Sequence, residues 1–187
     1  KKVKGNMLMQ EGTILLDGPS RVWLWPSSGE SVTCKGAGLK KTFIFNTIQN
    51  STGDLLNNIP VGGQNIDQPG MGIWEDFTIL ETANGDLDGT NGVNGIAAGF
   101  AEGLIIRRVD LLKAGNRAVN VEGVGHLTHY ELDNVNITEA WKNGFTAGGW
   151  STTEKCQMKL NNVEVDGWNL IANEAGGLVT ENIGGTI

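Results

Sequence analysis

A pattern that returns along the second half of the chain constrains the fold more than any other feature of the sequence. The segment ELDNVNITEAWKNGFTAGG occupies residues 131–149, and KLNNVEVDGWNLIANEAGG occupies residues 159–177. Each contains an apolar residue, two Asx residues, an alternating apolar strand, a Trp, an Asn, a second strand and glycines. Most other residues differ, so the pattern indicates a repeated shape whose units bury their inner faces against one another.

Each repeat predicts three short β-strands, with two bend residues between the first and the second. Asx residues favour such bends because they tolerate the left-handed backbone conformation. We expect Asn134 and Asn162 to stack as an internal ladder at the bends. The second strands alternate in and out, and their central apolar residues should lie inward, one above another: Val109, Val135, Val163 and Ile183. The third strands should carry outward Asn120, Thr146 and Ala172.

These coils resemble the right-handed parallel β-helix of the pectate-lyase-like superfamily. The motif LDNVNI…NGF is similar to its coil pattern. The segments EGTILLDGPSRVWLW and SVTCKGAGLKKTFIF are similar to its opening coils, with a turn at Gly36, Gly38 and Thr42. The resemblance implies an all-β fold, a single-stranded right-handed parallel β-helix (solenoid) with three short strands per coil. Members of this superfamily include polysaccharide lyases, glycosidases, epimerases and bacteriophage tailspikes, so the resemblance makes these the candidate classes of protein.

The resemblance covers nearly the whole chain of 187 residues. We therefore expect one β-helix domain over residues 1–187, and a fragment of a longer chain because the closing GGTI stops in mid-pattern. Residues 1–45 should form opening coils, 46–70 a long loop insertion and 71–187 the regular coils. A second loop, 82–95, should widen another coil, and long loops on a rigid scaffold often bind ligands.

Composition narrows the possible partners. The net charge of −7 argues against binding nucleic acid or an anionic membrane surface, because both require clustered Lys and Arg. No apolar run is long enough to span a membrane. The 28 glycines sit among apolar residues, which favours tight turns between strands over disorder. Cys34 and Cys156 form neither a disulfide framework nor a four-ligand zinc site, so we expect buried free thiols.

The candidate site consists of two Trp residues and two carboxylates. Trp141 and Trp168 fall at matching places in successive repeats, and Glu139 and Asp166 lie two residues before them. Stacked positions lie about 4.8 Å apart, so the four side chains could share one face. Trp rings can serve as platforms for sugars, and carboxylates about 5–5.5 Å apart suit a retaining glycosidase. Alternatively, the rings cover the edge of the core and the acids are merely solvated.

Signals for metals are weaker. Asn84, Asp86 and Asp88 match the first half of a calcium loop, but Gly95 stands where the loop requires a bidentate Glu. A turn is the alternative, and no cofactor is expected otherwise. His126 and His129 lie three apart on an expected strand and should point to opposite faces, so they should not bind one metal. The cluster of Asp residues that holds calcium in pectate lyases has no counterpart in the third strands.

The resemblance suggests a phage tailspike or tail-fibre module that binds, and could cleave, a bacterial surface polysaccharide. Such a module would be a homotrimer when intact and would reside in the virion tail or outside the cell. One alternative is a secreted polysaccharide lyase or glycosidase of the same fold. Another is a structural spacer in a fibre or adhesin. The sequence leaves open whether the chain is an enzyme.

Overall fold

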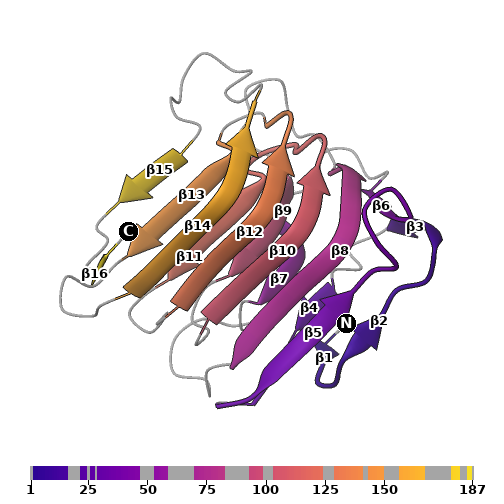
Figure 1. Ribbon diagram of the computed structural model, residues 1–187, viewed down its shortest axis with the longest axis horizontal. Coiled ribbons are helices and arrows are strands. Elements are labelled where there is room, and N and C mark those ends of the chain that lie inside the picture. Colours follow the sequence, from indigo (N-terminus) through magenta and orange to yellow (C-terminus); the bar gives the residue numbers. More distant parts are fainter. Residues whose placement is uncertain are drawn as a thin grey trace.

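The computed structural model describes residues 2–16, 22–24, 26–27, 29–46, 53–58, 70–82, 93–98, 103–123, 129–140, 143–149, 156–166, 178–181 and 185–186. Throughout these residues the protein is all-β, and the strands pair in parallel. From β6 onward, consecutive strands alternate between two sheets, which stand one behind the other in Figure 1. Strands that are neighbours within a sheet therefore belong to successive coils.

The first sheet has seven strands. In spatial order they are β1 (Lys2–Val3), β4 (Val22–Leu24), β7 (Gly53–Asn58), β9 (Val93–Ala98), β11 (Val119–Gly123), β13 (Phe145–Gly149) and β15 (Leu178–Glu181).

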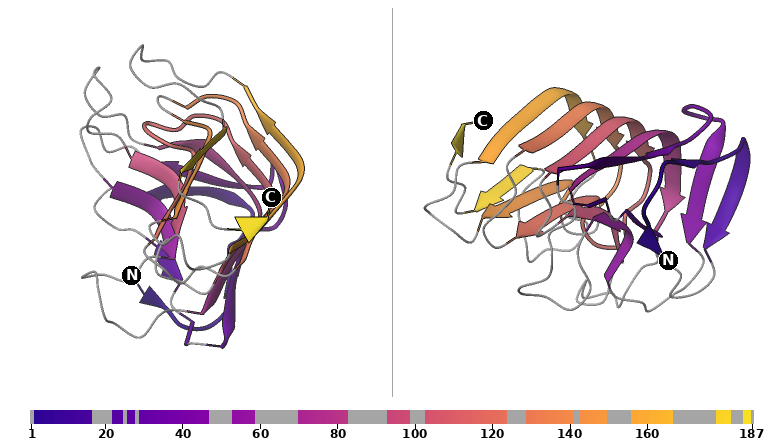
Figure 2. Two further views of the ribbon diagram at one scale, coloured as in Figure 1. Left: turned by 90° about the vertical axis from the view of Figure 1, so that its left-hand side faces the viewer. Right: turned by 90° about the horizontal axis from the view of Figure 1, so that it is seen from below.

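The second sheet has nine strands. Its main path runs through β16 (Gly185–Thr186), β14 (Cys156–Val165), β12 (His129–Ile137), β10 (Gly103–Leu111), β8 (Met71–Glu81), β5 (Ser31–Lys35) and β2 (Met7–Leu8). Beside this path, β3 (Gly12–Leu16) pairs with β6 (Thr42–Asn46), and β6 pairs with β8. The two sheets enclose one apolar core, and Figure 2 shows the coils stacked along its length. The prediction of an all-β parallel solenoid is confirmed.

The long strands of the second sheet bend sharply in the middle. A residue with positive φ marks each bend: Asp76 in β8, Arg108 in β10, Asn134 in β12 and Asn162 in β14. Parallel pairing continues on both sides of the bend, for example from Arg107 with Asp133 to Val109 with Val135. The first and second strands expected in each of these coils are thus two arms of one bent strand.

The predicted inward stack is present in the described coils. Phe77 pairs with Val109, Val109 with Val135 and Val135 with Val163. The first three side chains are fully buried, and Val163 packs against the core from a half-buried position. Ile183, the last expected member, lies outside the described residues.

The expected turn between β5 and β6 is held by its glycine and threonine. Gly36 donates its backbone N–H to Glu75 O at 2.9 Å, which brings the turn against the bend of β8. A Cβ on Gly36 would lie 2.1 Å from Asp76 O, so any larger residue would collide with the backbone. Thr42 Oγ1 donates to Gln10 O at 2.9 Å and accepts from Ala37 N at 2.8 Å.

The prediction that residues 46–70 form only a loop is wrong in the middle of that segment. Strand β7 lies there and pairs with both β4 and β9. Its consecutive Leu55 and Leu56 are buried in the core. This apolar pair is short and is surrounded by polar residues, so sequence periodicity alone did not identify it as a strand.

Candidate functional site

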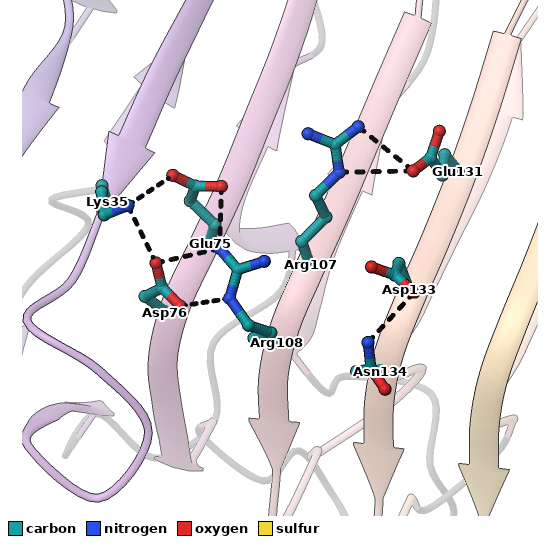
Figure 3. Close-up of polar contacts among 8 residues, drawn as sticks. All are labelled: Lys35, Glu75, Asp76, Arg107, Arg108, Glu131, Asp133 and Asn134. Atoms are coloured by element: carbon teal, nitrogen blue, oxygen red, sulfur yellow. Dashed lines mark hydrogen bonds and ion pairs between the residues drawn. The ribbon is translucent and has the colours of Figure 1, made fainter.

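The outer face of the nine-stranded sheet carries a network of charged side chains (Figure 3). One row in register contains Lys35, Glu75, Arg107, Asp133 and Asn161, so that the sign of the charge alternates along its first four members. At the N-terminal end of the row, Lys35 Nζ lies 3.1 Å from both Glu75 Oε1 and Asp76 Oδ2. Arg108 binds the same two carboxylates from the next coil, with Nη2 3.0 Å from Asp76 Oδ2 and 3.2 Å from Glu75 Oε2.

A second group of charges surrounds Glu131. Its Oε1 lies 3.1 Å from Arg107 Nη2 and 3.8 Å from Lys159 Nζ, and its Oε2 lies 3.6 Å from His129 Nε2. Burial alone would raise the pKa of Glu131, but the hydrogen bond from Arg107 and the nearby charges of Arg107 and Lys159 lower it overall.

Amide side chains extend the network toward the last coils. Asn162 Nδ2 donates to Asn134 Oδ1 at 2.7 Å, and Asn161 Nδ2 donates to Asp133 Oδ1. The prediction that Asn134 and Asn162 are bend residues in contact with each other is confirmed. The prediction of an internal ladder is wrong, because both side chains are exposed. A side chain at the outside of a bend faces solvent, whereas its neighbours Val135 and Val163 turn inward.

The charged network is suited to a structural role. The hydrogen bond from Arg108 is the main reason that the pKa of Asp76 is lowered, and the pKa of Glu131 is lowered as well. Neither carboxylate can therefore act as a proton donor near neutral pH. The sequence predictions above do not include this network, although the alternating charge at the aligned positions 75, 107 and 133 is a signal for it.

The outer face of the seven-stranded sheet carries a different feature, which we call the outer row: Asn57, Ala97, Asn120 and Thr146. These residues are in register on β7, β9, β11 and β13. They alternate with Ile96, Val119 and Phe145 of the core, so they face outward. That orientation was expected for Asn120 and Thr146, whereas Ala172 lies outside the described residues.

The outer row is buried, and three of its side-chain oxygen atoms have no hydrogen-bond partner. The exposed fractions of Asn57, Asn120 and Thr146 are only 4%, 4% and 6%. Asn57 Oδ1, Asn120 Oδ1 and Thr146 Oγ1 have no hydrogen-bond partner. Buried polar atoms nearly always have one, and an unpaired atom costs about 1–3 kcal/mol. The three oxygen atoms are covered by the protein, so a ligand that lies on the outside of the sheet does not reach them.

The predicted site residues are only partly described. Glu139 and Asp166 are exposed, whereas Trp141 and Trp168 lie outside the described residues. The backbone shows which positions stack. Asp166 N donates to Ile137 O at 2.8 Å, just as Thr138 N donates to Leu111 O at 2.9 Å. Asp166 therefore stacks on Thr138, one position away from Glu139. The two carboxylates are not equivalent in the coils, and the site itself stays a prediction.

The other candidate residues give few contacts. The proposed calcium ligands Asn84, Asp86 and Asp88 lie outside the described residues, as does His126. Among the residues that are described, no group of three His, Cys, Asp or Glu side chains could hold a metal ion. That part of the chain also has no helix that could span a membrane.

Of the two cysteine side chains, the structure describes only that of Cys34. Cys34 is a free thiol in the core, as expected, and burial raises its pKa to about 12. The thiol is therefore unreactive at neutral pH. Cys156 lies in β14, but its side chain falls outside the described part.

Comparison of the chain with protein-family models, with curated proteins and with solved structures gave no significant match.

Proposed function

We propose that this protein is a polysaccharide-binding module of the kind found in bacteriophage tailspikes and tail fibres, in which the outside of a β-solenoid holds a bacterial surface glycan. The observation that carries the proposal is the parallel solenoid itself, in which equivalent positions of successive coils recur at the strand spacing of about 4.8 Å. A linear polymer of repeating hydroxyl-bearing units is a chemical partner that suits such a periodic surface.

The predicted Trp and carboxylate residues support the proposal. Glu139 is exposed and comes two residues before Trp141 in the chain, ahead of β13. An aromatic platform beside an exposed carboxylate would suit a sugar ligand. In the proposed module the protein is a homotrimer and resides in the virion tail or outside the cell.

A structural spacer is a second candidate, and the charged network favours it. On the outer face of the nine-stranded sheet, the described carboxylates at positions 75, 76 and 131 are all bonded to cations of neighbouring coils. Such a surface stabilises the stack and offers little to a ligand. A spacer would leave the exposed Glu139 and the predicted aromatic residues without a role, and for this reason we prefer glycan binding.

Glycan-array screening of the whole chain, followed by calorimetry on the best ligand, tests the proposal. Trp168→Ala should weaken binding by about 1–3 kcal/mol, by analogy with aromatic stacking on nucleic-acid bases. Asn136→Ala, on the outer face of the other sheet, is the matched control and should bind normally. Failure to bind any bacterial polysaccharide would leave the spacer as the better explanation.

A catalytic role is tested separately with Glu139→Gln. If the chain cleaves its ligand through Glu139, this variant should release no sugar and should bind with unchanged affinity, because Gln keeps the shape but cannot act as acid, base or nucleophile. Equal sugar release by the variant and the unaltered protein would exclude Glu139 as the catalytic group.

A further inference from the structure

We infer that the copies of the proposed homotrimer pack against one another along an apolar strip on the outer face of the nine-stranded sheet, with their solenoids parallel. This inference rests on the proposed function, because it names the surface of that module which a second copy of the chain covers. The strip is exposed, carries no charge and has charges of opposite sign on its two sides.

The apolar strip consists of Leu15, Phe45, Leu80 and Leu112, one residue from each of four successive coils. Leu15 of β3 pairs with Phe45 of β6. Leu80 of β8 lies beside Phe45, at the register shift between these two strands. Leu112 follows β10 and donates its N–H to the backbone oxygen of the residue before Leu80 at 2.9 Å, so it stacks on Leu80. Figure 1 shows the four strands side by side.

The side chains of the apolar strip point away from the core. The residues before Phe45, Leu80 and Leu112 belong to the core, and successive side chains of a strand point to opposite faces. Leu15 is 60% exposed and Leu112 is 37% exposed, whereas Phe45 and Leu80 are half-buried. A contiguous apolar patch among polar residues is typical of a contact surface between proteins.

A strip without charge can lie on a symmetry axis. Around an axis parallel to the solenoid, identical residues of the copies meet at each level of the stack, and charged residues there would repel one another. Before the bend, the outer face of the same sheet carries the charged row that begins with Lys35 and Glu75. The apolar strip has no charged residue over four coils. It ends before Asp166, which stacks on Thr138 in the column that continues from Leu112.

The charges on the two sides of the strip are complementary between copies. Asp110 comes two residues before Leu112, and Lys113 comes directly after it. In a ring of parallel copies all strands run around the axis in the same sense, so the downstream side of one strip faces the upstream side of the next. Lys113 of one copy therefore approaches Asp110 of the next copy at the same level of the stack.

Both residues can make this contact. Lys113 Nζ lies 3.4 Å from Glu81 Oε1 in its own copy, and an ammonium group has three donors. The Asp110 side chain forms no ion pair within the described part of the chain. Burial raises the pKa of Asp110, and the charge of Lys40 only partly offsets this effect. A lysine from the next copy would stabilise the ionised carboxylate.

Sedimentation equilibrium of the whole chain tests the inference. We expect a homotrimer. Leu15→Asp and Leu112→Asp should each raise its dissociation constant about tenfold or more, because each removes an apolar contact and brings like charges to the axis. Leu8→Asp is the matched control and should assemble normally. Leu8 is 78% exposed on the same sheet, but it pairs with Lys35, away from the strip.

A charge exchange tests the contact beside the strip. Asp110→Lys and Lys113→Asp should each weaken assembly, and the double variant should restore it, because the exchanged charges attract each other across the contact. Asp110 and Lys113 form no ion pair with each other in one copy of the described chain. Restoration would therefore report on the contact between copies.

Two results would overturn the inference: a chain that is monomeric at every concentration, and an oligomer that none of the strip and charge variants weakens. Glycan binding by the monomer would leave the glycan-binding part of the proposed function intact. A monomer that binds no bacterial polysaccharide would overturn both.

Discussion

Among the described residues, five other than glycine have positive φ, and four of these lie at equivalent bends of successive coils. Asp76, Asn134 and Asn162 are residue types that tolerate this conformation well. Arg108 does not belong to that group, but its side chain binds Asp76 and Glu75 of the preceding coil. At this position a side-chain interaction between coils offsets a local conformational cost.

Substitution of Asn134 separates two effects on stability: that of its left-handed backbone conformation and that of its side-chain hydrogen bond with Asn162. Asn134→Ala should lower the free energy of unfolding by about 1–2 kcal/mol, because alanine is strained in the left-handed region. Asn134→Gly should cost less, since glycine adopts positive φ freely and only an exposed hydrogen bond is lost. Urea denaturation measures both changes. Asn136→Ala on the same strand, outside the bend, is the control, and an equal loss in all three variants would contradict the conformational explanation.

A glycine at the β5–β6 turn gives a second prediction for single residues. Gly36→Ala should cost about 2 kcal/mol or more, because the added Cβ would meet Asp76 O and must push the turn away from β8. Gly5→Ala is the matched control, since its Cβ would have no neighbour within 4 Å. Thermal unfolding of the two variants decides the matter, and similar melting temperatures would show that the turn can shift at little cost.

Ionic contacts between strands tie one coil to the next. The contacts of Asp76 and Glu131 cross from β8 to β10 and from β12 to β10. Both carboxylates have lowered pKa values in the folded protein. Their contribution to stability is therefore complete above the pKa of the unfolded chain, near 3.9 for Asp. It is lost as the pH falls through the lower pKa of the folded state.

Acid should consequently weaken the stack of strands. We expect the melting temperature to fall as the pH is lowered below about 4 in the unaltered protein. Arg108→Met removes the main cause of the lowered pKa of Asp76, so this variant should be less stable at pH 7 and lose less on acidification. Lys41→Met, at an exposed turn position, should follow the unaltered protein. Parallel pH profiles of Arg108→Met and the unaltered protein would show that the Asp76–Arg108 pair does not contribute.

As a whole, the described part of the molecule is a one-dimensional stack in which the strands of each coil pair with those of the coils beside it. Stability in such a solenoid is approximately a sum of coil terms and interface terms. A core residue between two described coils takes part in two interfaces. Leu132 is fully buried and lies in register between Ile106 and Leu160.

Core substitutions should therefore have effects that depend on their position in the stack. Leu132→Ala should cost about 2–5 kcal/mol, the usual range for a buried leucine. Leu16→Ala should cost less, because that side chain is half-buried and its strand β3 pairs only with β6 among the described strands. Urea denaturation provides both values. A larger loss for Leu16 would mean that the first coil is the more tightly packed part.

Much of the fold could be predicted from local sequence patterns. Alternation with period two, Asx residues at the bends and the recurring pattern indicated parallel strands and the inward stack of Val109, Val135 and Val163. These features depend on each residue and its near neighbours in the chain, so the sequence determines them directly. Strand β7 escaped prediction because a six-residue strand with one apolar pair has no periodicity that a short window can detect.

The candidate site depended on contacts that only the tertiary structure decides. Loop lengths differ between coils, so alignment of the Trp residues placed Glu139 opposite Asp166, whereas backbone pairing stacks Asp166 on Thr138. The burial of Asn57, Asn120 and Thr146 likewise depends on packing around the outer face of the sheet. A sequence specifies which residues can form strands and bends. Which side chains become neighbours across coils, and which polar atoms remain unpaired, follows only from the register in which the coils stack.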